Sequence, residues 1–568
     1  MVDVAPTQTV KSAASPGDLA LVAHRGDRGV LLAMDLPQER TDRLAGFALY
    51  RKTPGGVERP LLNRLDFATP VTSATTPAER RWHPSDKAPF QKFRWVDMPS
   101  PVEAGTYRYT ATARYFGGTG GLVDGPSAFV DIDLADEHLG ALTIGFTRGY
   151  ISSQAYADRF HNAPFEPDPP TVDFDTTPYR AQYQWLGFHA RELVMSFLAD
   201  CQSDLSVTLD VFAFDLNEPD VIRMMAGFGS RLRLYLDNSP THVDHADKPK
   251  ARPAMEPQAQ KAIEATGGAV KTGHFGSLAH DKVLIARRNG TPFRVLTGSA
   301  NFSVRGLYVQ SNNVLVFESA EVAGLYGLAF DQAWQNAPGF RNSAVAAQWS
   351  ALPAGIVPDG RVAFSPHSDP AVSLSPIVDS LNGAKSSVLF AVMDLSGGGP
   401  VLQTLRGIAD RSGIFSYGIT QTTKDFALYK PGSRRGIRIP FAFLSAHVPA
   451  PFNKEWDGGF GQVIHHKFAV VDFNGDSPVV YTGSSNLAQG GERNNGDNLL
   501  ELRGPAIASL YAVEAIKMID HYHFRAAMKT ATTDSPLILA GPADWQKWVA
   551  PYYDPNDLKS LDRQIFAR

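Results

Sequence analysis

A short motif occurs twice in this chain, and the constant spacing of its copies constrains the fold more than any other feature. The sequence reads LAHDKVLIARR over 278–288 and VIHHKFAVVDF over 463–473. Each copy places a His two residues before a Lys, and further landmarks recur at the same offset of 185 positions. The matched pairs are His280 and His465, Lys282 and Lys467, Gly298 and Gly483, Asn301 and Asn486, and Asn313 and Asn498. One offset shared by five landmarks indicates an internal duplication.

The chain around the motifs has the pattern of an α/β layered protein. From about residue 140, strand-like runs such as VTLDVFAFD and RLRLYLD alternate with helix-like segments such as RAQYQWLGFHARELVMSFLAD. A Pro-containing joint, SALPAGIVPDG, interrupts the pattern at 350–360, and the pattern then restarts. We therefore predict one half over 140–349, a second half over 361–530, and a C-terminal extension over 531–568.

The first part of the chain has a different pattern. Short alternating stretches such as GFALYRK and TYRYTATARYF are separated by Gly, Pro and Asp clusters. This pattern predicts a small all-β sandwich over 17–135, after a flexible N-terminus over 1–16. The segment FRWVDMPSPVEAGTYRYTATARY resembles the corner between two strands of a fibronectin type III sandwich, with Tyr107 or Tyr109 as the corner tyrosine.

Composition and charge exclude several classes of protein. The 568 residues are 43% apolar and 20% charged, as is typical of a globular chain. The net charge is −4 and no block of like charges occurs, so we expect no stable nucleic-acid partner. The single Cys201 excludes an internal disulfide and a cysteine-based metal cage. No His, Asp and Glu set with metal-ligand spacing accompanies the motifs, so we expect no catalytic metal and no cofactor.

No targeting or membrane-spanning segment is expected from the sequence. The N-terminus lacks an apolar core of signal-peptide length, and no run of about eighteen apolar residues occurs. We therefore expect a soluble protein, either cytoplasmic or secreted with its leader removed, and the compartment stays open.

The repeated residues are suited to phosphodiester chemistry. Side chains alternate along a strand, so the His and Lys of each motif point the same way. The later Thr-Gly-Ser-x-Asn stretch turns sharply at its Gly and brings a hydroxyl and a carboxamide to the same place. Two facing halves would then supply two imidazoles, two ammonium groups and two amides. Fixed cationic and amide donors stabilise the negative charge that develops on the oxygens of a reacting phosphate.

The two imidazoles have different tasks in such a reaction. One His attacks phosphorus, while the other protonates the leaving oxygen and later activates water or an alcohol. The reaction then passes through a phosphohistidine, and two displacements predict overall retention of configuration at phosphorus.

His-x-Lys followed by Gly-Ser-x-Asn, present twice, resembles the phospholipase D superfamily, the HKD phosphodiesterases. The resemblance covers residues 140–530 and implies two pseudo-symmetric α/β halves with mixed sheets, packed so that both motifs meet. It also implies that His280 is the nucleophile and His465 the general acid and base. Carried over by position, the catalytic residues are His280, Lys282, Asn301, His465, Lys467 and Asn486, and the supporting residues are Ser299, Ser484, Asp497 and Asn312.

The two halves depart from the family pattern in different ways. The Asp expected seven positions after the His is present as Asp472 but replaced by Arg287 in the first half, where we expect a structural effect. The acid that orients an imidazole is present as Asp497 but replaced by Asn312 in the first half. This asymmetry leaves open an exchange of roles, in which His465, as the His supported by Asp497, is the nucleophile.

Several nearby residues have a plainer interpretation. His466 should point away from the pocket, and His274 is expected in a loop. Arg305 and Arg493 are either solvated or in contact with a phosphate. The loop 453–462, with Trp456 and Phe460, has the composition of either a mobile lip or a surface turn.

The motifs specify a phosphodiester but do not specify which one. The acidic pI, the absence of a basic tract and the presence of both copies in one chain favour a monomeric phospholipase D. Its partners would be a phospholipid at a membrane or micelle surface and a water or alcohol acceptor. The alternatives are a nuclease or another phosphodiesterase of the same superfamily and, in a different class, a catalytically degenerate binding protein.

Overall fold

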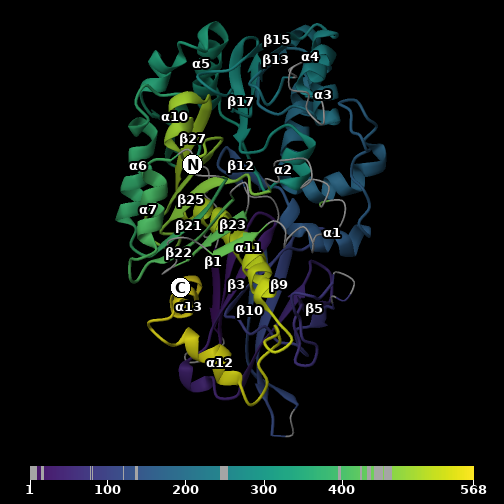
Figure 1. Cartoon of the computed structure of the whole chain (residues 1–568), viewed down its shortest axis with the longest axis vertical. Coiled ribbons are helices and arrows are strands. Elements are labelled where there is room, and N and C mark those ends of the chain that lie inside the picture. The colour runs from purple at the N-terminus through teal and green to yellow at the C-terminus, as the bar shows by residue number, and fades with distance from the viewer. Residues whose placement is uncertain are drawn as a thin grey trace.

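Two large mixed sheets repeat one strand order, and they form the upper part of the molecule in Figure 1. In this computed structural model the described residues are 9–13, 18–76, 79, 81–118, 121–134, 138–243, 254–393, 398–421, 425–430, 437–440, 452 and 463–567.

The sheet of the first half has eight strands. In spatial order they are β11 (His138–Leu139), β12 (Leu142–Phe146), β18 (Asn313–Phe317), β17 (Thr291–Gly298), β16 (Val283–Arg288), β13 (Val207–Ala213), β14 (Leu232–Asp237) and β15 (Ala269–Gly273). Neighbouring strands are parallel from β13 to β15 and antiparallel elsewhere, so the sheet is mixed.

The sheet of the second half has nine strands. In spatial order they are β19 (Ser350–Ala351), β20 (Gly360–Ser365), β27 (Asp497–Arg503), β26 (Val479–Gly483), β25 (Lys467–Val471), β21 (Ser387–Met393), β22 (Phe415–Gln421), β23 (Asp425–Tyr429) and β24 (Ile437–Pro440). The order β20-β27-β26-β25-β21-β22 repeats β12-β18-β17-β16-β13-β14, which confirms two pseudo-symmetric α/β halves with mixed sheets. The copies differ at one edge, because β23 runs antiparallel to β22 whereas β15 runs parallel to β14.

The central strands contain long apolar runs because both faces of each sheet are covered. VLIA of β16 and FAVV of β25 are buried throughout, as is β26, and β13 and β21 are buried at all but one position. The helices of the halves are α1 (Ser153–Phe160), α2 (Arg180–Ser203), α3 (Pro219–Ala226), α4 (Glu256–Glu264), α5 (Ala320–Asn336), α6 (Ala371–Gly383), α7 (Pro400–Ile408) and α10 (Gln489–Asn494).

The N-terminal region forms two four-stranded sheets around one apolar core. One sheet has the order β1 (Thr9–Ala13), β2 (Ala20–Gly26), β3 (Gly29–Asp35) and β8 (Arg94–Asp97). The other has the order β10 (Leu122–Asp133), β9 (Thr106–Phe116), β4 (Leu44–Lys52) and β5 (Glu58–Pro60), and β6 (Leu62–Asn63) pairs with β7 (His83–Pro84) beside them. The backbone N–H of Glu103 donates to the Tyr107 hydroxyl at 2.7 Å, as a corner tyrosine would accept it. The fibronectin type III assignment itself stays a prediction.

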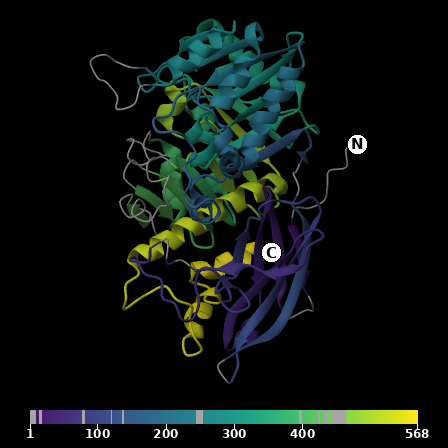
Figure 2. The ribbon, with the colours of Figure 1, turned by 90° about the vertical axis from the view of Figure 1, so that its right-hand side faces the viewer.

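The C-terminal part of the chain joins the halves to the N-terminal sheets. The long helix α11 (Pro505–Thr530) runs between them, as Figure 2 shows. The segment that the sequence indicates only as an extension then turns back, with α12 (Trp545–Val549) and α13 (Leu558–Phe566). Trp548, Val549 and Tyr552 enter the core of the N-terminal sheets, so this segment is part of the folded body. In the described part of the chain, no helix combines the length and apolar character needed to cross a bilayer.

Candidate active site

Each His-x-Lys motif is fastened to the opposite half by backbone hydrogen bonds. Ala279 forms a parallel bridge with Gly496, and the N–H of His280 donates to the carbonyl of Gly496 at 2.9 Å. Ser311 forms the equivalent bridge with Ile464, and the N–H of His465 donates to the carbonyl of Ser311 at 3.1 Å. The residue after Gly496 is Asp497, and the residue after Ser311 is Asn312. Each therefore lies beside the histidine of the other half.

Asp497 holds the ring of His280. The His280 Nδ1 lies 2.7 Å from the Asp497 Oδ1, and both side chains are almost wholly buried. A carboxylate oxygen accepts, so Nδ1 carries the proton and Nε2 keeps its lone pair. Burial raises the pKa of Asp497 to about 6, against the lowering effect of Lys282. Burial, together with the charges of Lys282 and Lys467, holds the pKa of His280 well below its usual range. A neutral imidazole with a free Nε2 is the form that can act as a nucleophile.

Asn312 holds the ring of His465 in the corresponding way without a charge. The His465 Nδ1 lies 2.9 Å from the Asn312 Oδ1 and 2.9 Å from the carbonyl oxygen of Ser299. The orientation of the Asn312 amide is fixed, because its Nδ2 donates to the carbonyl of Gly306 at 2.8 Å. Both neighbours of Nδ1 are acceptors, so the Nε2 of His465 also faces away from its support. Burial and the charge of Lys467 lower the pKa of His465 well below its usual range.

The two imidazoles meet in one site. Their ring centroids lie 6.4 Å apart at an interplanar angle of 58°. Among the described residues neither Nε2 has a hydrogen-bond partner, and both Nδ1 atoms point to the outer supports. The structure therefore brings His280 and His465 together from positions 185 residues apart in the chain.

Both lysines of the motifs are buried beside the histidines. Lys282 donates to the carbonyl of His280, and Lys467 donates to the carbonyl of His465 at 2.6 Å. The ammonium group of Lys282 also lies 4.9 Å from the centroid of the Phe214 ring. Burial lowers the pKa of Lys282 to about 8, and burial with the charge of Lys282 holds the pKa of Lys467 well below its usual range. A buried anion between them would restore the charge on both.

The two asparagines of the Gly-Ser-x-Asn stretches have unused acceptors. The Oδ1 atoms of Asn301 and Asn486 are buried without a partner among the described residues, and the Nδ2 of Asn301 donates to Asp215. A buried unpaired amide oxygen is costly, so it indicates a donor that arrives during the reaction, such as the O–H of water or an alcohol.

The serines of these stretches hold the scaffold and do not face the pocket. The Ser299 hydroxyl donates to the Asn312 Oδ1 at 2.8 Å and accepts from the N–H of Asn313 at 3.0 Å. The Ser484 hydroxyl lies 3.3 Å from the Asp281 carboxylate and accepts from the N–H of Asn498 at 2.9 Å. Both hydroxyls therefore hold the backbone directly after the supporting residues Asn312 and Asp497.

The duplicated asparagines that begin β18 and β27 link the two halves. The Asn313 Nδ2 donates to the Thr482 hydroxyl at 2.8 Å, and the Thr297 hydroxyl donates to the Asn498 Oδ1 at 3.0 Å. These reciprocal bonds give a physical reason for the matched positions in the sequence.

The exchange of roles depends on a contact between Asp497 and His465, and the structure contradicts that contact. Asp497 does not support the imidazole of its own half; it supports His280, across the interface between the halves. The carboxylate therefore lies beside the residue that the resemblance names as nucleophile.

The residues seven positions after each His are structural. Asp472 accepts from the backbone N–H groups of Lys385 and Ser386 at 2.9 and 2.7 Å. Arg287 instead donates through Nε to the buried Asp210 at 2.6 Å, and its Nη2 donates to Asp331 at 2.9 Å. The first half thus replaces a loop-capping carboxylate with an ion pair between neighbouring strands.

His466 and His274 make hydrogen bonds to residues other than the two imidazoles of the site. His466 is buried, its Nε2 lies 3.2 Å from Glu514, and its ring packs on Phe468. His274 contacts Asn238 through a hydrogen bond in an exposed loop. Arg305 is half-buried and Arg493 exposed. The loop 453–462 lies outside the described residues.

A second layer of residues at the site was missed by the sequence reasoning. Asp215 follows β13, and Asp237 ends β14; the ring of His242 lies between their carboxylates at 2.7 and 2.8 Å. Asp237 also accepts from the N–H of Ala279 at 2.6 Å, beside His280. Burial lowers the pKa of His242, but the two carboxylates outweigh it and raise the pKa to about 10. His242 is thus a charged link between two carboxylates that contact Asn301 and the backbone of the motif.

Asp215, His242 and Glu256 place one potential ligand atom each within 4.8 Å of one another, a grouping that the sequence spacing did not indicate. Both ring nitrogens of His242 already lie against carboxylates, so as an imidazolium it has no lone pair to give a cation. The donor set fits an ion triad better than a metal centre. A signal for Asp215 and Asp237 was present, because both stand at the carboxyl ends of adjacent parallel strands.

Comparisons with known proteins agree with this geometry. A family model described as cardiolipin synthase, PLD-like domain, matches residues 377–519. No curated protein sequence matches the chain.

Similar solved structures include three enzymes. A phosphatidylserine synthase of Haemophilus influenzae Rd KW20 is 11% identical over 65% of this chain and 91% of that chain, with a TM-score of 0.37. A phospholipase D family member, Nuc, of Salmonella typhimurium is 21% identical over 26% of this chain and 87% of that chain, with a TM-score of 0.20. A polyphosphate kinase of Porphyromonas gingivalis is 9% identical over 65% of this chain and 53% of that chain, with a TM-score of 0.35. These TM-scores are too low to support an inference about the reaction.

The family model covers the second motif and its Gly-Ser-x-Asn stretch, and the duplicated strand order carries the same arrangement to the first half. The second half therefore contains a PLD-like domain, and this match supports membership of the phospholipase D superfamily.

Proposed function

We propose that the chain is a phospholipase D-type enzyme that transfers a phosphatidyl group to water and, where an alcohol is present, to the alcohol. The observation that carries the proposal is the pair of imidazoles, one from each half, with centroids 6.4 Å apart and both Nε2 atoms free of partners among the described residues. The two motif lysines lie close enough to act on both imidazoles by their charge.

The reaction begins with His280. Its Nε2 attacks phosphorus and forms an N–P bond, while the bond from phosphorus to the leaving oxygen breaks. The Asp497 carboxylate accepts from Nδ1–H and stabilises the positive ring that results. This contact supports His280 as the nucleophile and His465 as its partner.

His465 handles the protons in both steps. The negative charge of the bound phosphate favours the imidazolium form of His465, which donates its Nε2 proton to the leaving oxygen in the first displacement. In the second, its neutral Nε2 takes a proton from water or an alcohol, whose oxygen attacks phosphorus and releases His280. Two in-line displacements leave the configuration at phosphorus unchanged.

Lys282, Lys467 and the Nδ2 amide groups of the two asparagines stabilise the charge on the equatorial oxygens. Their positions are fixed by burial and by the backbone carbonyls that the lysines contact, so little reorganisation is needed during the reaction. The phosphate in turn supplies the negative charge that keeps both lysines protonated.

A phospholipid is favoured over DNA on three grounds. The net charge is −4, no basic tract occurs, and the matched family model is named for a lipid enzyme. Nucleic-acid affinity normally requires several cationic phosphate contacts. We therefore propose a monomer that works at a membrane or micelle surface without a stable nucleic-acid partner, and a nuclease is the alternative.

A substrate panel tests the proposal. Phosphatidylcholine, single- and double-stranded DNA, and bis-p-nitrophenyl phosphate are each supplied with and without EDTA to the natural chain and to His280→Ala, His465→Ala and His274→Ala. We expect choline release that survives EDTA, vanishes in the first two variants and persists in His274→Ala, whose imidazole lies in an exposed loop.

The other outcomes of the panel separate the alternatives. DNA cleavage without lipid turnover would replace the lipid enzyme with a nuclease. No turnover of any substrate would favour a catalytically degenerate binding protein.

A further inference from the structure

A second pocket lies between the N-terminal sheets and the first half, and residues of α1 and α2 line it. Its volume is about 520 Å³, within the range of small-molecule sites. The turn over 100–104 forms one wall, and Trp185 and Phe188 of α2 form another. Three guanidinium groups line it, those of Arg28, Arg148 and Arg159.

Arg148 is buried without a counter-ion. It is only 5% exposed, and it donates to the Ser100 hydroxyl at 2.9 Å and to the carbonyl of Pro99 at 3.2 Å. Its guanidinium lies 4.0 Å from the ring centroid of Phe188 and 5.1 Å from that of Trp185. Within the described chain, no carboxylate lies in ion-pair distance of Arg148. A buried charge without a partner is costly, which indicates an anion that binds there.

The neighbouring carboxylates are either bonded to other groups or exposed. One oxygen of Asp27 lies 2.6 Å from His189 Nδ1, and the other accepts a hydrogen bond from the N–H of Phe146 at 2.7 Å. Glu192 pairs with Arg28 at 2.5 Å. Glu103 lines the pocket but is exposed. These carboxylates therefore form no ion pair with Arg148, on which the charge of Asp27 acts only from a distance.

The backbone is strained at the same place. Phe188 has φ of +47° and ψ of −138° in the middle of α2, a conformation that a bulky residue rarely adopts. The carbonyl of Leu186, beside this kink, accepts from the N–H groups of Arg148 and Gly149 at 2.8 and 3.3 Å. Strain of this kind gathers at ligand-binding sites, where it holds side chains in position. Here it places the Phe188 ring under the guanidinium.

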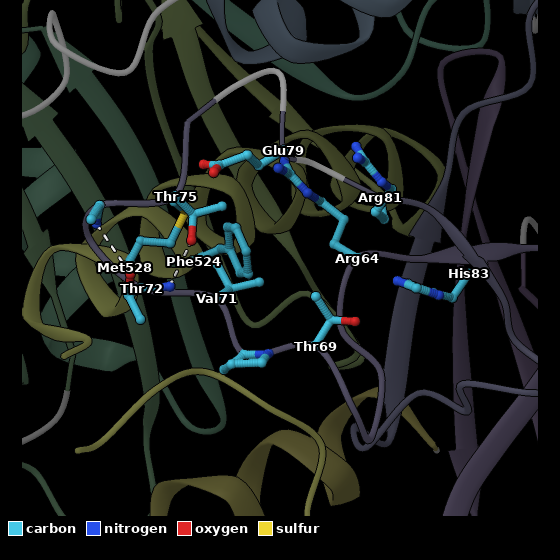
Figure 3. Close-up of a pocket in the computed structure, with 12 residues that line it drawn as sticks. Arg64, Thr69, Val71, Thr72, Thr75, Glu79, Arg81, His83, Phe524 and Met528 are labelled. Carbon is cyan, nitrogen blue, oxygen red and sulfur yellow. Dashed lines mark hydrogen bonds between the residues drawn. The ribbon is translucent and has the colours of Figure 1, made fainter. Parts of the chain in front are cut away.

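A pocket elsewhere in the molecule gives a useful contrast. Figure 3 shows Arg64 and Arg81 around it together with the acidic Glu79, and His83 beside them. Its arginines are exposed or half-exposed, and Asp66 lies 3.5 Å from His83. This pocket has acidic groups of its own and no buried cation, so it does not require an anion.

We propose that the pocket at Arg148 binds the phosphate group of a phosphomonoester, with the rest of the ligand against Trp185 and Phe188. A phosphomonoester carries a charge of about −1.5 to −2 and three acceptor oxygens, which suits a cluster of guanidinium groups. The phosphate can come from a soluble ester or from a lipid headgroup.

The pocket is connected to the candidate active site. Thr147, next to Arg148, donates through its hydroxyl to the carbonyl of Gln310 at 2.7 Å and accepts from the N–H of Asn312 at 2.9 Å. Asn312 orients His465. A ligand that fixes Arg148 therefore also fixes the residue that supports the general acid.

Calorimetric titration of glycerol 3-phosphate tests the site. We expect binding that weakens about tenfold or more in Arg148→Gln and in Arg159→Gln, because each loses a charge-assisted hydrogen bond. Arg159 is exposed, so its variant will fold even if the Arg148 variant does not. Arg288→Gln, an exposed arginine paired with Asp204 at 3.3 Å, serves as the matched control and should bind normally.

The active site also suits phosphate, so the double variant His280→Asn, His465→Asn is titrated as well and should keep the binding at the pocket. Cosedimentation with vesicles of phosphatidylcholine, with and without phosphatidic acid, distinguishes a lipid headgroup from a soluble ester. Unchanged binding in both arginine variants, or binding lost only in the double histidine variant, would overturn the proposal. The proposed phosphomonoester site does not depend on which substrate the active site takes.

Discussion

The carboxylate of Asp497 and the ammonium group of Lys282 set the pH range in which the site can work. The pKa of Asp497 is raised to about 6, so the carboxylate that holds His280 is protonated below this pH. The pKa of Lys282 is lowered to about 8, so its charge is lost above that pH. Activity should therefore require a deprotonated Asp497 and a protonated Lys282.

This gives a prediction for kcat/KM as a function of pH. We expect a bell-shaped profile with limbs near pH 6 and pH 8. Asp497→Asn should lower the rate and remove the acid limb, because the amide does not titrate in this range. Lys282→Arg should move the alkaline limb upward, since a guanidinium stays protonated. An acid limb that persists unchanged in Asp497→Asn would contradict the assignment.

A second prediction concerns Asn312, the uncharged counterpart of Asp497. Asn312→Ala removes the acceptor that fixes His465 Nδ1, and we expect kcat to fall by roughly one to two orders of magnitude. Asn312→Asp keeps an acceptor and should recover most of that loss, with a shift of the pH profile because a carboxylate raises the pKa of the imidazole. Equal activity of Asn312→Ala and the natural chain would show that the contact has no role.

Strands β13, β14 and β16 are tied together by an ion cluster around Asp210. Arg287 of β16 and Arg233 of β14 both contact this buried carboxylate, at 2.6 and 2.7 Å. Arg287→Met leaves Arg233 as the remaining partner, so we expect a loss of about 1–3 kcal/mol in the free energy of unfolding with kcat little changed. Denaturant titration measures the loss, and Arg288→Met is the exposed control. A large fall in kcat with unchanged stability would contradict the structural role of Arg287.

The elements of the two halves could be predicted largely from sequence, because duplication makes their apolar runs visible twice. The constant offset placed both motifs and both Gly-Ser-x-Asn stretches in equivalent strands. The contact of each histidine with a supporting residue of the opposite half could not be predicted, because nothing in the sequence says whether Asp497 faces His280 or His465. The backbone bridges of Ala279 to Gly496 and of Ser311 to Ile464 place Asp497 beside His280. His242 carried no signal, because only the folded ends of β13 and β14 bring Asp215 and Asp237 to opposite sides of its ring.

At the scale of the molecule, Arg94 of β8 ties the N-terminal sheets to the C-terminal helices. It is 7% exposed and lies 2.6 Å from both Asp520 of α11 and Asp562 of α13. The sequence indicated only an extension after residue 530, because short amphipathic helices do not reveal which core they enter. The structure shows that this segment completes the N-terminal core.

Arg94→Met should therefore destabilise the whole molecule by about 3–5 kcal/mol, because two buried carboxylates lose their partner. Calorimetry should show an earlier transition for the N-terminal sheets and α11–α13. Arg108→Met, which affects an exposed pair with Asp131, should change stability little. Equal melting of the two variants would show that Arg94 does not join these parts.

The central claim is that His280 and His465, one from each half, act on one phosphorus atom. A crystal structure with bound tungstate, an analogue of phosphate, tests it most directly. The account predicts a single tungsten between the two rings, with its oxygens contacted by Lys282 and Lys467 and both Nε2 atoms directed at it. Tungstate bound beside only one ring, with the other imidazole in a separate pocket, would contradict it.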